Sequence, residues 1–269
     1  MTHMIYVVPS LKAKEKLQSE GKAWAESQGF TYVLRHQRTI QDLMDEYGED
    51  FLVYSSRGPQ IDRPEGSHFF SLNMAELRIQ NLRKGQRDHL LEALMGRGSS
   101  KLPITVLDCT CGFGADAAVA SFGLPAGSRV DALEVSPLLE AVTSWGFSHF
   151  VHKKDDVTAA LRRISLRRGD YRDYLLSDEG PVYDVLYFDP MFQRPVEASC
   201  QFQPVRSIME HGGLTRDLIE RALQKARRRV VIKERDFRQL CRDFPEAVLY
   251  GGKYSRIGYA VLECDSWKK

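Results

Sequence analysis

The 269-residue chain has few cysteines and no long hydrophobic run. Its five cysteines are odd in number and form no CxxC pair, which argues against a disulfide framework and a zinc site and favours a reducing compartment. No segment approaches the roughly eighteen apolar residues of a transmembrane helix, and the N-terminus lacks the apolar core and cleavage site of a secretion signal. We therefore expect a cytoplasmic protein with no metal centre and no membrane contact.

Charge of neither sign dominates, since 38 Lys and Arg residues are balanced by 36 Asp and Glu residues. Basic residues nevertheless gather in two stretches, residues 162–168 and 225–242. Each stretch could meet the phosphates of a nucleic acid, or it could be an ordinary solvated helix face or strand end. The charge pattern alone leaves both alternatives open.

The C-terminal two-thirds of the chain alternates short β-rich runs with helical ones, which is typical of a parallel sheet flanked by helices. The expected strands are Thr105–Asp108, Arg129–Glu134, Ser165–Arg168, Val182–Asp189, Arg229–Lys233, Ala247–Tyr250 and Arg256–Cys264. The last two follow each other too closely for a crossover helix, so they should pair antiparallel. We predict an α/β protein whose residues 73–269 form a Rossmann-like, mostly parallel seven-stranded sheet ending in an antiparallel hairpin.

Residues 1–72 form a smaller α/β pattern of their own. The expected elements are strands at Tyr6–Val8, Thr31–Arg35 and Phe51–Tyr54 and helices at Leu11–Gln28 and Thr39–Tyr47. Residues 57–59 have the composition of a turn, and Met74–Leu94 has a helical period with a break near Gly85. This N-terminal subdomain could recognise a substrate, or it could cover one edge of the larger sheet.

A glycine-rich turn follows the first strand of the predicted sheet, within Val106–Asp116. Gly112 and Gly114 lack a Cβ, so the backbone can turn sharply and approach a ligand closely before a helix begins. The third glycine of the dinucleotide-binding pattern is absent, because Ala117 stands at its position. Such a turn fits S-adenosylmethionine (SAM), but two glycines alone are weak evidence.

Polar side chains around this turn are suited to the parts of SAM. Asp108 ends the strand, where it can face the ammonium group of the methionine moiety, and Thr110 and Asp116 can hydrogen-bond the same end. Glu134 ends the second strand, where a carboxylate would accept hydrogen bonds from both ribose hydroxyls. Asp170 follows the third strand, in a position suited to the adenine amino group. Solvent-exposed carboxylates are the alternative interpretation of the last two.

The fourth strand ends in the tetrapeptide Asp189-Pro190-Met191-Phe192. A carboxylate and the following carbonyl can accept the hydrogens of an exocyclic amine, turn its lone pair towards a methyl group and take its proton. Proline would fix the turn, and Phe192 could stack on a base. Alternatively, Asp-Pro caps the strand while the next two residues fill the core. A nicotinamide-dependent dehydrogenase would share the glycine turn but would have no use for this loop.

These residues resemble the bacterial small-subunit ribosomal RNA guanine-N2 methyltransferases of the RsmJ type. The likeness lies in Leu107–Ala117, Tyr187–Phe192 and Val230–Phe237, with a looser match at Met74–Arg78. The resemblance implies a class I SAM-dependent methyltransferase fold. The cofactor contacts that it implies are Ala115, Asp116, Glu134, Val135, Asp170, Tyr171 and Asp189.

Three positions depart from the family pattern. Ala115 and Val135 stand where the family has arginines, and residues 196–203 replace a lysine-rich stretch. The resemblance therefore supports the cofactor more strongly than a particular RNA target. Lys233, at the end of the fifth strand, could approach a phosphate or the transferred group, or it could be a surface lysine.

The sequence thus predicts a SAM-dependent methyltransferase that modifies a guanine amino group in 16S ribosomal RNA or the small ribosomal subunit, and so takes part in rRNA processing. Its expected catalytic residues are Asp189, Pro190 and Phe192. A methyltransferase of a small molecule or a protein is the alternative within enzymes. A non-catalytic RNA-binding assembly module that retains the cofactor fold is the alternative outside them.

Overall fold

The structure, a computed structural model, describes residues 4–96, 102–190, 213–251 and 257–267. These residues group into two compact units, one containing residues 4–71 and 136–150 and the other containing the remaining described residues. Each unit has a sheet of its own. That residues 1–72 and residues 73–269 are two separate domains stays a prediction.

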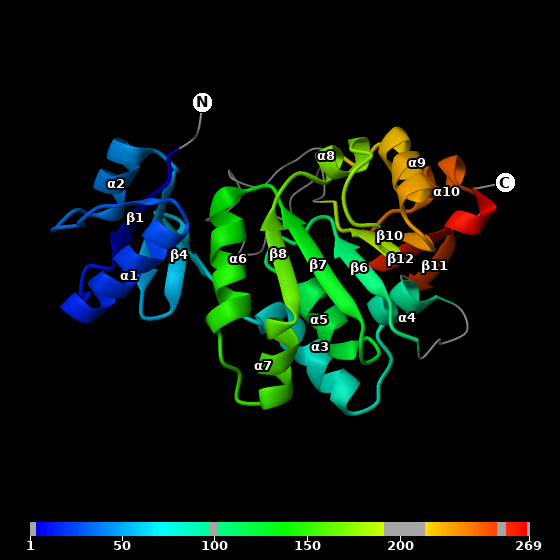
Figure 1. The fold of residues 1–269 in the computed structure, drawn as a ribbon, viewed down its shortest axis with the longest axis horizontal. Coiled ribbons are helices and arrows are strands. Elements are labelled where there is room, and N and C mark those ends of the chain that lie inside the picture. Colours follow the sequence, from blue (N-terminus) through cyan, green and yellow to red (C-terminus); the bar gives the residue numbers. More distant parts are fainter. Residues whose placement is uncertain (1–3, 97–101, 191–212, 252–256, 268–269) are drawn as a thin grey trace. The chain divides into compact units, whose positions relative to one another are not determined.

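The first unit is built on a five-stranded sheet with the order β2-β1-β3-β4-β5 (Figure 1). Its elements are β1 (Tyr6–Pro9), α1 (Glu15–Ser27), β2 (Thr31–Tyr32), α2 (Ile40–Tyr47), β3 (Phe51–Ser55), β4 (Gly58–Arg63), β5 (Gly66–Phe69) and α6 (Pro137–His149). β1 runs parallel to β2 and β3, whereas β3, β4 and β5 form an antiparallel meander. Thr39 and Asp42 form a reciprocal capping box that starts α2.

The sequence did not predict β4 or β5, and residues 58 and 59, which begin β4, have the composition of a turn. Ser56 and Arg57 form the turn, and Gly58 already belongs to β4. Gly58 has a φ of 86°, and a Cβ there would lie 2.5 Å from the ring of Trp145 in α6. Glycine is therefore required by a left-handed backbone and a close approach of α6.

The second unit is built on a seven-stranded sheet with the order β11-β12-β10-β9-β6-β7-β8. Its strands are β6 (Thr105–Asp108), β7 (Arg129–Glu134), β8 (Ile164–Arg168), β9 (Val185–Phe188), β10 (Arg229–Glu234), β11 (Val248–Gly251) and β12 (Gly258–Glu263). Five neighbouring strands, from β10 to β8, are parallel, and β12 pairs antiparallel with both β10 and β11. The predicted parallel sheet with a terminal antiparallel hairpin is confirmed.

Helices cover both faces of this sheet (Figure 1). They are α3 (Asn73–Arg83), α4 (His89–Met95), α5 (Ala115–Gly123), α7 (Asp155–Arg162), α8 (Tyr171–Leu176), α9 (Arg216–Lys225) and α10 (Arg238–Asp243), followed by a 3-10 turn at Cys264–Ser266. On one face, Leu186, Val230 and Ile232 pack with Ile219 and Leu223 of α9. On the other face, α5 packs against α3, α4 and α7.

The predicted break between α3 and α4 is confirmed. Gly85 follows α3 with a φ of 75°, a left-handed conformation that ends a helix at little cost for glycine. Asp88 then caps α4, and its carboxylate accepts hydrogen bonds from the amides of Leu90 and Leu91. The break turns one long apolar pattern into two helices that both pack against α5.

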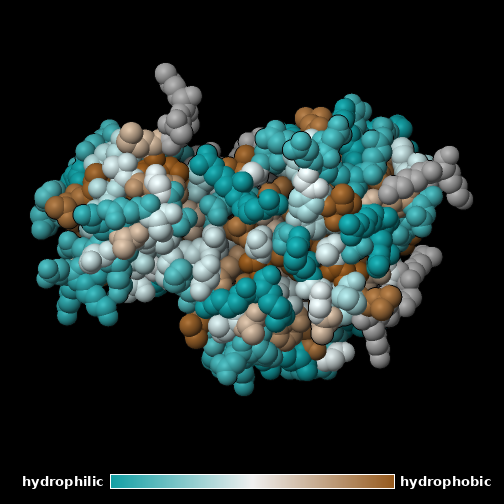
Figure 2. Space-filling view, viewed as in Figure 1, coloured by the Kyte–Doolittle hydropathy of each residue, from teal (hydrophilic) through white to brown (hydrophobic). Residues whose placement is uncertain are grey.

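The visible surface is mostly hydrophilic, with hydrophobic residues in scattered patches (Figure 2). Such scattering is normal for the surface of a folded domain. Among the residues that the structure describes, no helix is both long and apolar enough to span a bilayer.

Candidate active site

The carboxyl ends of the parallel strands bring the predicted acidic residues to one edge of the second sheet. Asp108 is the last residue of β6, Glu134 is the last residue of β7, and Asp189 directly follows β9. Asp170 lies two residues after β8 and caps α8 with its carboxylate. Because ligands of open α/β sheets bind at this edge, the four positions share one candidate site.

The glycine-rich turn connects β6 to α5 at the same edge. Gly112 and Gly114 have φ values of 54° and 75°, in the left-handed region that favours glycine. The amide of Gly112 donates a hydrogen bond of 2.9 Å to Oε2 of Glu134, which fastens the turn to β7. Among the described residues, a Cβ added at Gly112 would meet only the carbonyl oxygen of Thr110, at 3.9 Å. The turn is therefore held in place, and the described residues leave open space in front of it.

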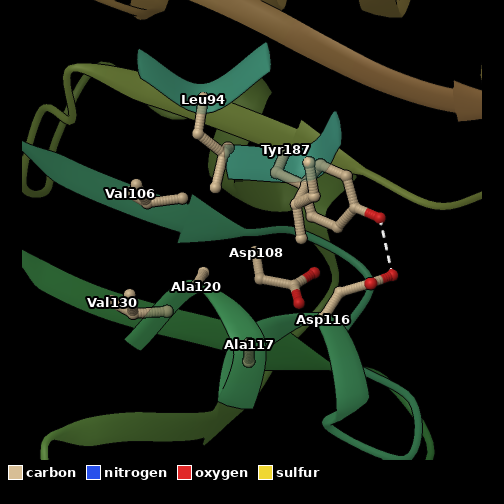
Figure 3. Close-up of a pocket in the computed structure, with 9 residues that line it drawn as sticks. Leu94, Val106, Asp108, Asp116, Ala117, Ala120, Val130 and Tyr187 are labelled. Atoms are coloured by element: carbon tan, nitrogen blue, oxygen red, sulfur yellow. Dashed lines mark hydrogen bonds between the residues drawn. The ribbon is translucent and has the colours of Figure 1, made fainter. Parts of the chain in front are cut away.

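Asp108 lies beneath the turn and is only 2% exposed. Its carboxylate accepts a hydrogen bond of 3.1 Å from the amide of Thr110. Burial raises the pKa of Asp108 well above its ordinary value, although the Thr110 amide opposes the rise. Figure 3 shows Asp108, Asp116 and Tyr187 at the polar end of a small pocket whose other lining residues, from α4, β6, α5 and β7, are apolar.

Thr110 joins the glycine-rich turn to the segment that follows β9. Its Oγ1 accepts a hydrogen bond of 2.7 Å from the amide of Asp189. The side chain of Asp189 is 26% exposed, so it is accessible while its backbone is held. Pro190 follows it and is half-buried, whereas Phe192 and residues 196–203 lie outside the described residues.

Lys233 bridges two of the predicted acidic residues. Its Nζ lies 2.8 Å from Oδ2 of Asp116 and 2.7 Å from Oδ2 of Asp189, and its side chain is 15% exposed. Burial alone would lower the pKa of Lys233, but the two carboxylates raise it above its ordinary value. The sequence left open a surface lysine or a contact with a phosphate or the transferred group. The surface alternative is wrong, because the side chain is mostly buried and bridges two carboxylates.

Asp116, in the first turn of α5, accepts hydrogen bonds from three side chains. Its Oδ1 binds the guanidinium of Arg78, and its Oδ2 binds the Tyr187 hydroxyl (2.7 Å) and Lys233. Burial raises the pKa of Asp116, but Lys233 and Arg78 lower it well below its ordinary value. Arg78 also pairs with both oxygens of Asp88, at 2.8 and 2.9 Å. The predicted contact of Asp116 with a cofactor stays a prediction.

The predicted adenine contacts lie at the end of β8. The carboxylate of Asp170 pairs with Arg172, which lowers its pKa against the effect of burial. Tyr171 is buried, and its ring packs edge-to-face on Phe188 at a centroid distance of 5.4 Å. Two other predicted contact positions are half-buried at this edge: Ala115 and Val135.

The second basic stretch is divided between the two edges of the sheet. Arg227–Arg229 lie where β10 begins, at the edge opposite the candidate site, and Arg228 pairs with Asp184 at 3.2 Å. Arg235 directly follows the carboxyl end of β10 and is exposed. In the first stretch, exposed Arg167 and Arg168 end β8, on the site's edge. The basic residues near the site therefore come from both stretches.

The sequence interpretation missed three residues of this site: Arg78 and Tyr187, which bind Asp116, and Tyr259, which lies opposite Lys233 on β12. Arg78 lies on the buried stripe of α3, between Ala75 and Ile79. A basic residue within an apolar helical stripe was the available signal. The two tyrosines could be assigned only from strand register, which no local pattern supplies.

The family model described as "Putative SAM-dependent methyltransferase" matches residues 66–258. The uncharacterized protein YpiP of Bacillus subtilis (strain 168) is 28% identical over 230 residues, which cover 85% of this chain and 88% of the relative. Ribosomal RNA small subunit methyltransferase J of Aeromonas salmonicida is 29% identical over 209 residues, 76% of this chain and 81% of the relative. The corresponding protein of Marinobacter nauticus is 28% identical over 193 residues, 71% of this chain and 66% of the relative.

The crystal structure of a SAM-dependent methyltransferase from Neisseria gonorrhoeae has a similar fold, with a TM-score of 0.63. The match covers 96% of this chain and 95% of that chain, at 17% sequence identity. At this identity the similarity concerns the fold alone.

Proposed function

The chain belongs to the family of SAM-dependent methyltransferases, and on that premise we propose that it methylates the exocyclic N2 amine of a guanine in small-subunit ribosomal RNA. The position of Asp189 carries this proposal. Its carboxylate is accessible and directly follows a central strand, and its amide is hydrogen-bonded to Thr110, next to the glycine-rich turn. The names of the relatives from Aeromonas and Marinobacter support the choice of RNA.

The candidate site fits the cofactor. When bound, SAM supplies a methyl group on a sulfonium that is already activated for transfer. Open space in front of Gly112 would admit the ligand, while Glu134 would accept the ribose hydroxyls and Asp170 the adenine amino group. Buried Asp108 would take the ammonium group, since a cation would offset the cost of ionising it.

Asp189 would handle the acceptor. Its carboxylate and the backbone carbonyl beyond it would accept the two amine hydrogens and direct the nitrogen lone pair towards the methyl group. As the bond from nitrogen to carbon forms and the bond from carbon to sulfur breaks, Asp189 would take a proton from the amine and pass it to solvent. Pro190 restricts the backbone at this point, so the carboxylate and carbonyl keep a fixed geometry.

Exposed arginines at the site's edge support a polyanionic substrate. Arg167 and Arg168 end β8, and Arg235 follows β10, so positive charge lies at both flanks of the strand ends that carry the acidic residues. Such residues attract phosphates without specifying sequence. A protein or small-molecule acceptor would have no general need for them.

The test is methyl transfer from labelled SAM to small ribosomal subunits, and to their stripped RNA, from a strain that lacks this protein. We expect label in RNA, mapped to a guanine by nuclease digestion and mass spectrometry. Asp189→Ala should leave SAM affinity within about tenfold, or about 1.4 kcal/mol, while nearly abolishing transfer. Label in protein, or none in RNA although SAM binds, would refute the RNA assignment.

A further inference from the structure

We propose that Lys233 is a positioning residue for the methyl acceptor: it holds Asp189 by one carboxylate oxygen, so that the other, ionised and exposed, faces the acceptor amine. The inference rests on the proposed function in one respect, namely that Asp189 receives the amine. It assigns a role to a lysine that bridges one buried and one partly exposed carboxylate and that the steps above do not use.

Strand register places Lys233 under the site. β10 pairs with β9 in the register Val231↔Tyr187 and with β12 in the register Lys233↔Tyr259. Because side chains alternate along a strand, Tyr187, Lys233 and Tyr259 share one face of the sheet. Asp116 of α5 meets Lys233 on that face, so the lysine ends between a helix and the strand-end loop.

The two carboxylates that bind Lys233 are used differently. Asp116 uses both oxygens for side-chain donors of the protein. Asp189 binds Lys233 through Oδ2, and in the part of the chain that the structure describes no donor is bonded to its Oδ1. The amide of Asp189 is held by Thr110 and its Oδ2 by Lys233, so the carboxylate is restricted in orientation and Oδ1 is left for a ligand. That oxygen is the one suited to an amine hydrogen.

The charges around Asp189 explain why a cation is needed there. Burial raises the pKa of Asp189 and Lys233 lowers it, while Asp116 and Glu234 raise it further. The groups that interact with Asp189, from four elements, are Lys233 and Glu234 of β10, Asp116 of α5, Tyr187 of β9 and Asp108 of β6. Of these described groups, only Lys233 is a cation. Without it, Asp189 would hold its own proton to higher pH and could not take one from the amine.

Three variants separate this role from packing. Lys233→Met removes the charge, Lys233→Arg keeps it, and Lys84→Met removes an exposed lysine just beyond α3 as a matched control. For Lys233→Met we expect kcat for RNA methylation to fall at least tenfold at pH 7, but by no more than the roughly 10²–10⁴-fold that general base catalysis contributes. The acid limb of the pH profile should move to higher pH, so activity recovers in part at pH 9. Lys233→Arg should restore the limb. A uniform loss with an unmoved limb would overturn the proposal.

A measurement without substrate tests the role of Lys233 separately from the proposed RNA substrate. Carboxyl ¹³C NMR of aspartate-labelled protein, with the signal assigned through Asp189→Asn, gives the titration midpoint of Asp189. Lys233→Met should raise that midpoint and Lys84→Met should leave it unchanged. Asp116→Asn, which removes the competing carboxylate, should lower it, and this variant serves if Lys233→Met does not fold. Unmoved midpoints would overturn the role of Lys233, whereas a wild-type protein that labels no RNA would overturn only the proposed substrate.

Discussion

Arg78→Met should destabilise the second unit far more than loss of an exposed ion pair would. Arg78 pairs with Asp88 and Asp116, and the three side chains are 26%, 11% and 10% exposed. Removing one partner of a buried pair costs roughly 3–5 kcal/mol, because a charge is left without compensation. Here each carboxylate keeps other donors: Asp88 caps α4, and Asp116 retains Lys233 and a tyrosine. We therefore expect the lower end of the range, about 3 kcal/mol.

The assay is urea denaturation followed by circular dichroism. Hydrogen exchange of the β6 amides then shows whether the loss of stability lies in the second unit. Arg83→Met is the matched control, since Arg83 lies on the same helix but pairs with Asp156 across an exposed contact, at 34% and 54% exposure. That loss should cost less than about 1 kcal/mol. Equal costs for the two arginine variants would refute this reasoning.

Other consequences of the structure can be measured separately. Glu134→Ala should weaken SAM binding by about 1.5–3 kcal/mol in calorimetry, and unchanged affinity would remove this residue from the site. Gly146→Ala should destabilise the first unit by about 1–3 kcal/mol on denaturation, because the new Cβ would lie 1.9 Å from the Phe70 ring. Burial lowers the pKa of His68 to about 4 from 6.5, so the unfolded chain binds more protons between these values. Stability should therefore fall by about 3 kcal/mol from pH 6.5 to pH 4, and the fall should disappear in His68→Gln.

The larger sheet could be predicted from local signals. Strands such as Val185–Phe188 are buried on both faces, so they appear in the sequence as unbroken apolar runs. The last two strands have no room for a crossover helix between them, and this predicted their antiparallel pairing. The positions of Asp108, Glu134 and Asp189 followed from the rule that parallel strands end at one edge. Each of these inferences needs only residues that are close to one another in the sequence.

What could not be predicted depends on contacts between distant segments. Gly58 has the composition of a turn, and its left-handed backbone together with the approach of Trp145 explains a glycine at the start of β4. Likewise, Lys233 is 117 residues from Asp116 along the chain and 44 from Asp189. Its partners follow from the packing of α5 on the sheet and from strand register, neither of which a local pattern encodes. The sequence located the acidic residues and Lys233, but it revealed neither the carboxylates that Lys233 binds nor Arg78 as a second cation on Asp116.

The buried charges of the second unit alternate in sign along one path: Asp88, Arg78, Asp116, Lys233 and Asp189. Each cation lies between two carboxylates, so three negative charges meet two positive ones and one negative charge is left over. Of the three carboxylate side chains, Asp189 is the most exposed, at 26% against 11% and 10%. In the proposed reaction, the excess charge would lie where a cationic sulfonium meets an amine that must lose a proton. Fixed charges of this kind stabilise developing positive charge without reorganisation, and this is the electrostatic contribution that methyl transfer to an amine requires.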